Sequence, residues 1–514
     1  MTSQVKSNRR LAHNTIILYF RMFLIMGITL YTSRVILQIL GVEDYGIYNI
    51  VGGIVTIFTS ISSSIGNASS RFITFSLGSN NSEEQQNVFS TTIIIHVLFC
   101  FIVLLFCETI GLYLFYEKLV IPSERMHAAF WAYQFSIASI LFLFMSLPYN
   151  SMIIAHEKIK TFAYISILDV ILRLAMVYVL PLLPWDKLAL YAFLQVLVQT
   201  VIQFFYYLYC KYNYPETSFK WVWNKNLQKR ILSYSSWIFI GTITSSLYTQ
   251  GINILLNIFY GPIINAAQGI AMQIQSAIDR LSQNVQTAIR PQITKSYAEK
   301  DYFRLYDLIK LGTKVSFILM FMMAVPLIFQ IDVILKIWLG NYPQQTEQFA
   351  IILILIIIVK LFGSPLMIAI QATEKIRKVE LWSCIVLITI PISYWILKNY
   401  KIEAYFIFII ALIVEIVSLS IRIHITFKQM KMDFRKYKKD LIYPILKSSV
   451  ISIIVPFIIS YNLNISNLYI KLIFMTTICI ISIGLSFYLF GLDTIEKNKI
   501  KIIMNNFKKR IIHH

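Results

Sequence analysis

Long apolar stretches recur along this sequence, and they limit the chain to one class of fold. A transmembrane helix needs about 20 consecutive, mainly apolar residues, and most of these stretches are that long. The segments between them are short, so they leave no room for a sizeable soluble domain. We therefore predict an all-α integral membrane protein with about 14 transmembrane helices. The expected spans are 14–38, 45–66, 89–115, 128–148, 162–183, 188–210, 234–257, 263–289, 311–330, 349–371, 381–398, 404–426, 447–463 and 468–491.

The excess of basic residues has a topological explanation. The chain carries 46 Lys and Arg against 25 Asp and Glu, which gives a formal net charge of +21. If the N-terminus is cytoplasmic, 31 of the basic residues fall in inner segments and six in outer loops. Cytoplasmic loops of membrane proteins are enriched in Lys and Arg in this way. We therefore expect cytoplasmic N- and C-termini, and we expect no nucleic acid partner.

Two spans that are more polar than the others suggest an internal repeat. The second span and the eighth both carry polar residues at helical spacing and are followed by a basic residue, Arg71 and Arg290 respectively. Since six spans separate them, we predict two parallel six-helix lobes and an extra helix pair, an arrangement known among transporters. The predicted divisions are a cytoplasmic N-tail (1–13), an N-lobe (14–210), a cytoplasmic linker (211–230), a C-lobe (231–427), a basic cytoplasmic loop (428–446), spans 13 and 14 (447–491) and a basic cytoplasmic C-tail (492–514).

The eighth span lies within the stretch 261–290, which has one polar and one apolar side. Gln275 and Asp279 recur on the polar side at helical spacing, whereas Ile274 and Ile278 lie on the opposite side. Polar residues within a membrane bundle face its interior or a water-filled cavity, so we expect this helix to line a central cavity. Arg280, next to Asp279 and toward the same side, is the best single candidate for contact with a substrate.

Basic residues inside the spans need a partner or a function, because a charge at the bilayer centre costs at least about 2.5–3.5 kcal/mol. Arg holds phosphate through bidentate hydrogen bonds, so a basic cavity predicts an anionic substrate. Structural roles are the alternative: Arg21 and Arg34 can extend to the membrane surface, and Arg71 and Arg290 can anchor helix ends there. The predicted substrate-binding residues are Arg280, Arg21, Lys360, Arg173, Arg34, Arg71, Arg290, Gln275 and Asp279.

Two acidic residues within the spans are candidates for ion coupling. Asp169 precedes Arg173 by four residues, which is the favourable order for an ion pair within a helix. This pair is either structural or releases Arg173 to a ligand. Glu415 has no basic residue within four positions. A carboxyl group inside the membrane can relay protons, and a hydrogen-bonded structural acid is the alternative.

Signatures of catalysis and metal binding are missing from the sequence. It contains no GxSxG, HExxH, Walker A or GxGxxG motif, its seven histidines are scattered, and its five cysteines form no CxxC pair. We therefore expect no enzyme, no catalytic or metal-binding residues and no cofactor. A coupling ion, either Na+ or H+, stays open, because an ATP-driven pump has no motif to support it.

Two segments of the sequence resemble a known family. Asn14–Val55 and the IWLGNYP element at Ile337–Pro343 resemble Wzx-type polysaccharide and O-antigen repeat-unit flippases. These flippases belong to the multidrug/oligosaccharidyl-lipid/polysaccharide (MOP) exporter superfamily. Within the first segment, the LGxxxYGxY-like element comprises Leu40, Gly41, Tyr45, Gly46 and Tyr48. Together with the fourteen-span layout, the resemblance covers most of the chain.

The resemblance carries expectations about architecture and transport. It implies two six-helix lobes in a V around a central cavity, with spans 13 and 14 flanking a groove for a polyprenyl tail. It implies that undecaprenyl-diphosphate-linked oligosaccharide crosses from the cytoplasmic to the periplasmic leaflet of the bacterial cytoplasmic (inner) membrane, for O-antigen, capsule or exopolysaccharide synthesis. Arg21 and Arg280 would hold the diphosphate. Besides the bilayer and this lipid, polysaccharide polymerase machinery would be a partner.

Two other functions compete with this expectation. A cation-coupled multidrug exporter of the same superfamily usually has twelve spans, and an acidic cavity suits cationic drugs. The fourteen spans and the basic intramembrane residues count against it. A membrane-embedded glycan polymerase or ligase would need a large outer loop with catalytic residues, but the longest outer segments, near 116–127 and 331–348, are short.

Overall fold

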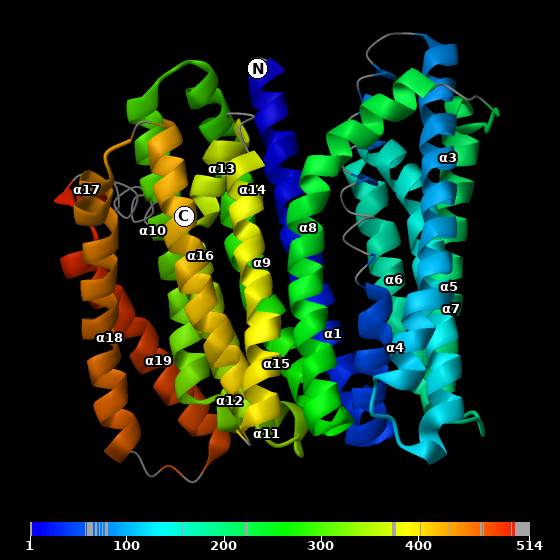
Figure 1. Cartoon of the computed structure of the whole chain (residues 1–514). Coiled ribbons are helices and arrows are strands. Elements are labelled where there is room, and N and C mark those ends of the chain that lie inside the picture. Colours follow the sequence, from blue (N-terminus) through cyan, green and yellow to red (C-terminus); the bar gives the residue numbers. More distant parts are fainter. Residues whose placement is uncertain are drawn as a thin grey trace, which may run out of the picture. The chain divides into compact units, whose positions relative to one another are not determined.

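The computed structural model of this chain is helical throughout the elements it describes, and no strand occurs among them (Figure 1). The backbone is described for residues 3–56, 58, 65–66, 69–70, 72–74, 76–77, 81–156, 158–221, 225–372, 377–400, 402–430, 432–462, 465, 467–494 and 496–498. Within these ranges, the side chains that are not described are those of residues 3–23, 159, 226, 230–241, 281, 284, 287–288, 291, 294–295, 298, 372, 377 and 462.

The chain divides into two compact units. Unit 1 comprises Met1–Gly269, Pro343–Gln345 and Ser383–Ile407, and unit 2 comprises Ile270–Tyr342, Thr346–Trp382 and Phe408–His514. The boundary between the units falls inside one continuous helix. These units are defined by compactness alone. They do not test the predicted division into two six-helix lobes, 14–210 and 231–427, which stays a prediction.

Unit 1 is a bundle of long helices in which α5 and α7 pack along each other (Figure 1). A short π-helical segment, Cys107–Gly111, joins α3 to α4. The α-helices of this unit are α1 (Ser3–Thr56), α3 (Ser82–Phe106), α4 (Leu112–Glu117), α5 (Met126–Ala155), α6 (Ile159–Val179), α7 (Lys187–Asn213), α8 (Lys225–Tyr260), the beginning of α9 (Pro262–Ala298) and α15 (Thr389–Asn399).

Unit 2 begins within α9 and ends with a helical hairpin, α18 and α19, that packs on α10. A π-helical turn, η5 (Lys438–Ile442), precedes α18, and another, η6 (Phe487–Gly491), follows α19. The α-helices of this unit are α10 (Tyr302–Phe329), α11 (Ile331–Leu339), α12 (Thr346–Leu361), α13 (Ser364–Ala372), α14 (Arg377–Ser383), α16 (Phe406–Met430), α17 (Phe434–Tyr437), α18 (Tyr443–Asn462) and α19 (Leu468–Ser486).

The helices have the length and composition of membrane spans. Ten described helices are long and apolar enough to cross a bilayer, and the bent pair α12 and α13, with 43° between them, would make an eleventh. The predicted class, all-α and multi-pass in the membrane, is thereby confirmed. Helix α9 is not among the ten, because polar residues occupy one of its sides.

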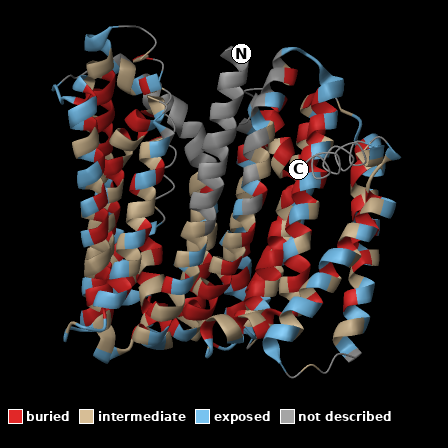
Figure 2. Cartoon of the chain, turned by 180° about the vertical axis from the view of Figure 1, so that it is seen from behind, coloured by how far each residue is buried: buried red, intermediate tan, exposed pale blue. Residues whose placement is uncertain are grey.

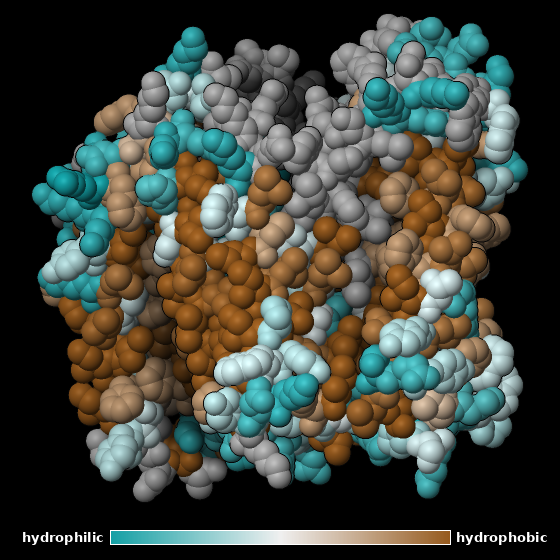
Figure 3. Space-filling view, viewed as in Figure 1, coloured by the Kyte–Doolittle hydropathy of each residue, from teal (hydrophilic) through white to brown (hydrophobic). Residues whose placement is uncertain are grey.

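Large apolar side chains face outward as well as inward. Phe101, Phe457 and Ile473 are 63%, 61% and 68% exposed, which is the reverse of a soluble protein, where such side chains are buried. On the face seen in Figure 3, apolar residues cover the middle of the helices and polar residues gather toward their ends. Figure 2 shows buried, intermediate and exposed positions mixed along the helices for which it gives burial. The outward apolar residues therefore fit contact with lipid.

The conspicuous glycines of the sequence lie where α1 bends and where it meets α9. Helix α1 is interrupted at Gly41, whose φ of 76° and ψ of 172° are not helical and favour glycine. Five residues later, a Cβ atom on Gly46 would overlap the backbone carbonyl group of Pro262 at the start of α9. The LGxxxYGxY-like element thus contains one residue that lets the helix break and one that lets two backbones approach closely.

The hairpin between α8 and α9 is held by buried asparagines. Gly261 forms the turn with a φ of 78°. The side-chain NH2 group of Asn265 donates to the backbone carbonyl oxygen of Asn253 at 2.8 Å and to the side-chain oxygen of Asn253 at 2.6 Å. The side-chain NH2 group of Asn257 donates to the side-chain oxygen of Asn265 at 3.0 Å. Asn257 also accepts from the Val120 amide at 2.7 Å. Unpaired amides would be costly in an apolar bundle, so these mutual bonds explain why asparagines are tolerated here.

An arginine joins three elements of unit 1 near the start of α7. Arg125 Nε lies 2.7 Å from Asp44 Oδ1, and its Nη1 lies 2.7 Å from Asp186 Oδ2. Asp186 caps α7 by accepting hydrogen bonds from the amides of Leu188 and Ala189. Burial would by itself raise the pKa of Asp186, but the hydrogen bonds from Arg125 and from these amides outweigh it and hold the pKa below its usual value.

This depressed pKa predicts a loss of stability in acid. A carboxylate whose pKa is lower in the folded chain than in the unfolded chain stabilises the fold when the pH is above its pKa in the unfolded chain, about 3.9. That stability is lost as the pH falls through the pKa of the same group in the folded chain. We expect Asp186→Asn to lack this contribution and so to lose less thermal stability between about pH 5 and about pH 3. Melting temperatures of the purified protein in detergent measure this, with Glu124→Gln, at the exposed residue next to Arg125, as the control. Equal losses in Asp186→Asn and in the unmodified protein would contradict the assignment.

Candidate functional site

Helix α9 has the two-sided character that the sequence predicts. Ile270, Ile274 and Ile278 are buried, whereas Gln275 and Asp279 are half-buried. The apolar stripe is therefore buried, and the opposite side is the more accessible one. A cavity along that side stays a prediction.

The charged pair on this polar side is arranged as two separate groups. Arg280 is exposed, and Asp279 accepts a hydrogen bond from Gln283 Nε2 at 2.9 Å, one turn further along. Adjacent residues on a helix point in different directions, so the Asp279 carboxylate is used along its own helix. This leaves the Arg280 guanidinium on the accessible side, where an anion can approach it.

The first turns of α9 differ from the expected polar stripe. Asn265 is fully buried and belongs to the asparagine cluster of the hairpin, and Gln268 is 2% exposed. Gln268 lies seven residues before Gln275, and Asn265 lies fourteen before Asp279, so helical spacing alone would place both on the same polar side. In the first turns of α9 the polar side therefore packs against α8, because the hairpin brings these two helices together. Further along α9 the same side is more accessible.

The predicted ion pair on α6 is present and belongs to a network across three helices. Arg173 Nε lies 3.0 and 3.1 Å from the two carboxylate oxygens of Asp169, and Arg173 Nη1 donates to Gln195 Oε1 at 2.5 Å. Gln195 in turn donates to the Tyr191 hydroxyl at 3.0 Å, and the Tyr191 ring packs edge-on against Tyr48 of α1. The Arg173 guanidinium is therefore engaged by neighbours in unit 1. Roles in substrate binding for Arg173 and in ion coupling for Asp169 stay predictions.

Glu415 lies at the centre of a second charged cluster, in unit 2. Its side chain is 4% exposed, and its Oε1 accepts from Arg422 Nη2 at 2.5 Å. Lys360 Nζ lies 3.9 Å from the other oxygen, Oε2, and the lysine side chain is 41% exposed. Glu380 of α14 is also buried and lies within electrostatic range of Arg422. The Glu415 carboxylate is thus neutralised chiefly by Arg422, and Lys360 is its more distant and more accessible partner.

Arg422 was not among the predicted partners of Glu415, because an ion pair within a helix was expected only at spacings of up to four residues. Seven residues are two helical turns, so Glu415 and Arg422 lie on the same side of α16. The long arginine side chain bridges the two turns. A spacing of seven residues is therefore the sequence signal for this pair.

The other predicted residues do not form one described site. Arg34 on α1 is half-buried, and Arg290 toward the end of α9 is exposed. Arg71 lies outside the described residues, and so does the side chain of Arg21, whose backbone belongs to α1. Within the described part of the chain, no group of His, Cys, Asp and Glu is arranged to hold a metal ion.

Residues 11–297 match the model of a family described as "Polysaccharide biosynthesis protein". This chain belongs to the polysaccharide biosynthesis protein family. No curated protein matches the sequence. The resemblance to MOP-superfamily flippases, first suggested by Asn14–Val55, is confirmed by this match.

Solved transporter structures have a similar fold. An inward closed structure of the lipid II flippase MurJ has a TM-score of 0.71 at 15% identity, over 93% of this chain and 98% of that chain. An inward-facing multidrug resistance MATE family transporter of the MOP superfamily has a TM-score of 0.65 at 13% identity, over 79% of this chain and 94% of that chain. The MATE multidrug transporter DinF-BH has a TM-score of 0.58 at 16% identity, over 81% of this chain and 95% of that chain. The chain therefore shares the fold of these flippase and transporter structures.

Proposed function

We propose that this protein flips undecaprenyl-diphosphate-linked oligosaccharide from the cytoplasmic to the periplasmic leaflet by alternating access. Its product would feed synthesis of O-antigen, capsule or exopolysaccharide. The observation that carries the proposal is the polysaccharide biosynthesis family match over residues 11–297. The similar fold of a lipid II flippase, over 93% of this chain, favours a lipid-linked substrate. The proposed location is the bacterial cytoplasmic membrane, with both termini in the cytoplasm.

The chemical problem for such a protein is the diphosphate. Moving its charges through the bilayer core is prohibitive unless cations and hydrogen-bond donors replace the lost water. The basic residues proposed for this task are Arg21, Arg34, Arg71, Arg173, Arg280, Arg290 and Lys360. Gln275 and Asp279 would adjust the polarity beside Arg280, while Asp169 and Glu415 are proposed for coupling to Na+ or H+.

Arg280 and Lys360 have the strongest structural support within this set. The Arg280 side chain is exposed on the polar side of α9. Lys360 is 41% exposed and lies 3.9 Å from Glu415, which Arg422 already neutralises. A phosphate can therefore approach the lysine without opening the buried Glu415–Arg422 pair. Polysaccharide polymerase machinery would receive the flipped lipid on the outer side.

A multidrug exporter is the second candidate, because two MATE transporters have similar folds, with TM-scores of 0.65 and 0.58. The two functions differ in their substrates and so in a deletion phenotype. Deleting the gene, in a strain with no second exporter of this family, should abolish the surface polysaccharide and accumulate lipid-linked repeat units in the cytoplasmic leaflet. Normal surface polysaccharide combined with increased drug sensitivity would instead support the multidrug exporter.

Substitution of Arg280 tests the proposed role of α9. We expect Arg280→Ala to reduce restoration of surface polysaccharide about 10-fold to 100-fold, because losing charge-assisted hydrogen bonds costs about 1.5–3 kcal/mol. Arg280→Lys should retain part of the activity, since it keeps the charge and loses the bidentate geometry. Ser276→Ala, an exposed position one turn earlier on α9, is the matched control. Full restoration by Arg280→Ala at normal membrane abundance would exclude this role.

A further inference from the structure

Two lysines lie on one side of α10 and are buried by the C-terminal part of the chain. Lys310 and Lys314 are four residues apart, so they lie on successive turns of the helix. Their side chains are only 17% and 4% exposed. Ammonium groups withdrawn from water to this extent require anionic partners nearby.

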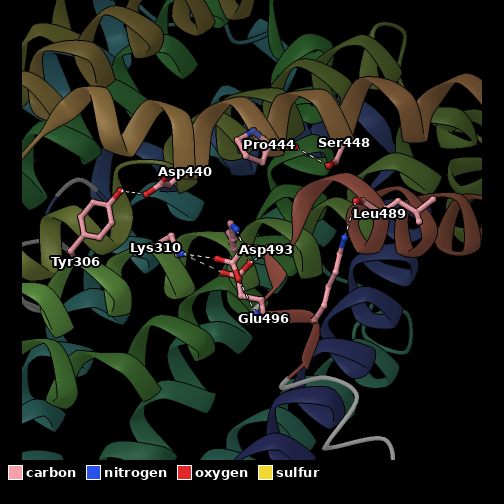
Figure 4. Close-up of polar contacts among 10 residues, drawn as sticks. Tyr306, Lys310, Asp440, Pro444, Ser448, Leu489, Asp493 and Glu496 are labelled. Atoms are coloured by element: carbon pink, nitrogen blue, oxygen red, sulfur yellow. Dashed lines mark hydrogen bonds and ion pairs between the residues drawn. The ribbon is translucent and has the colours of Figure 1, made fainter.

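The chain supplies those partners from the segment that follows η6. Asp493 Oδ2 lies 2.9 Å from Lys310 Nζ (Figure 4). Glu496 Oε2 lies 2.8 Å from Lys314 Nζ. The other Glu496 oxygen, Oε1, is 3.9 Å from Lys310 Nζ. The carboxylate of Glu496 therefore bridges both ammonium groups, and we refer to these four residues as the C-terminal clasp.

The acidic side of the clasp is organised independently of the lysines. The Asp493 amide donates to Glu496 Oε2 at 2.9 Å, and the Glu496 amide donates to Asp493 Oδ1 at 2.8 Å. This reciprocal pair has the pattern of a capping box at the start of a helix. Both carboxylates would keep these hydrogen bonds if the turn moved away from α10. The two lysines, in contrast, would be left without these anionic partners.

The hairpin beneath the clasp is held by other contacts. The Ser486 hydroxyl donates to the Ser448 carbonyl oxygen at 2.7 Å, and the Ser482 hydroxyl donates to that of Ser452 at 2.8 Å. Tyr306, one turn before Lys310, donates to Asp440 Oδ2 at 3.3 Å (Figure 4). These bonds join α18 to α19, and Asp440, just before α18, joins this hairpin to α10. Asp493 and Glu496 can therefore separate from the two lysines without breaking the contacts that hold the hairpin.

Asp493 is the most exposed residue of the clasp. Lys314 is 4% exposed, Glu496 12% and Lys310 17%, whereas Asp493 is 39% exposed. Buried ion pairs add little net stability compared with well-packed apolar residues. The pairing of these two buried lysines with Asp493 and Glu496 is therefore better explained by a contact that can open and close than by a gain in stability. Asp307, which acts electrostatically on Lys310, is exposed to solvent and does not cover the lysines.

We propose that Lys310 and Lys314 form a phosphate-binding site that Asp493 and Glu496 occupy as built-in substitutes for the ligand. One carboxylate already contacts both ammonium groups at 2.8 and 3.9 Å, and a phosphate group, with more oxygens and at least equal charge, can bridge them in the same way. The ligand is either the phosphate of a lipid headgroup or a free phosphate compound. The proposed site includes neither Arg280 nor Lys360 and does not rest on the proposed transport function.

Competition with the chain's own carboxylates makes the site testable. If the clasp is closed about nine-tenths of the time, apparent affinity for phosphate is about tenfold weaker than at the open site. We expect Asp493→Asn with Glu496→Gln to bind short-chain phosphatidic acid in detergent at least tenfold more tightly than the unmodified full-length protein. Asp493→Asn alone keeps the Lys314–Glu496 pair and should show a smaller increase. Asp440→Asn, which removes a carboxylate outside the clasp, should leave the affinity unchanged.

The lysines and a second probe complete the experiment. Adding Lys310→Gln and Lys314→Gln to the double variant should return binding to the weak level produced by the other basic residues. Tighter binding of inorganic pyrophosphate as well as phosphatidic acid would assign the site to phosphate groups in general, and tighter binding of phosphatidic acid alone to lipid headgroups. The proposal would be overturned if the Asp493→Asn/Glu496→Gln variant or the Asp493→Asn variant, shown to be monodisperse and helical, bound phosphatidic acid no more tightly than the unmodified protein. It would also be overturned if the gain in affinity persisted after both lysines were replaced.

Discussion

Arg422→Met is expected to lower the free energy of unfolding by about 3–5 kcal/mol, the usual cost of breaking one half of a buried ion pair. The Glu415 side chain is 4% exposed, and Arg422 is its nearest cation, at 2.5 Å. Methionine is unbranched and fits irregular apolar space, so the dominant effect is a carboxylate left in the bundle without its main partner. Thermal unfolding of the purified protein in detergent, compared with the unmodified chain, measures the loss.

Lys360→Met is the matched control for this prediction. Lys360 lies 3.9 Å from Glu415 and is 41% exposed, so its removal should cost about 1 kcal/mol or less. Adding Glu415→Gln to Arg422→Met should recover most of the stability, because the carboxylate that Arg422 contacts directly is then replaced by a neutral amide. Equal losses for the two single variants, or no recovery in the double variant, would show that Arg422 is not the principal partner of Glu415.

Gly46→Ala is expected to destabilise unit 1 by about 3 kcal/mol or more, at or beyond the upper end of ordinary overpacking. The added Cβ would overlap the backbone carbonyl of Pro262. A flexible side chain could rotate away, but a carbonyl at the start of α9 can move only if the helix moves. We expect reduced abundance in the membrane and a lower melting temperature for the purified protein.

Gly52→Ala provides the comparison on the same helix. The nearest atom to a Cβ at Gly52 is Ser136 Oγ at 4.0 Å, so the methyl group fits without displacing a neighbour. Alanine also favours helix over glycine by about 1 kcal/mol, and this variant should be as stable as the unmodified protein or more so. If Gly46→Ala behaved like Gly52→Ala, the close approach of α1 and α9 would not hold in the protein.

Features that depend on residues close together in the sequence could be predicted before the structure was known. The pairing of Asp169 with Arg173 follows from a spacing of four residues, which is one helical turn. The two sides of α9 follow from the same periodicity. Prediction failed where the partners lie more than four residues apart, as for Glu415 and Arg422, and where a neighbouring helix changes the environment, as α8 does for Asn265.

The sequence by itself determined that this chain is an all-α membrane protein, because the apolar stretches are long and every backbone polar group inside a bilayer must be paired within its own helix. Only the tertiary structure decided which charges meet. Lys314 and Glu496 are separated by 182 positions, and no local periodicity relates them. Long-range pairing depends on how helices pack, whereas the formation of each helix depends on its own residues. The same amino acids therefore specify their helices locally and their ion pairs only in the folded bundle.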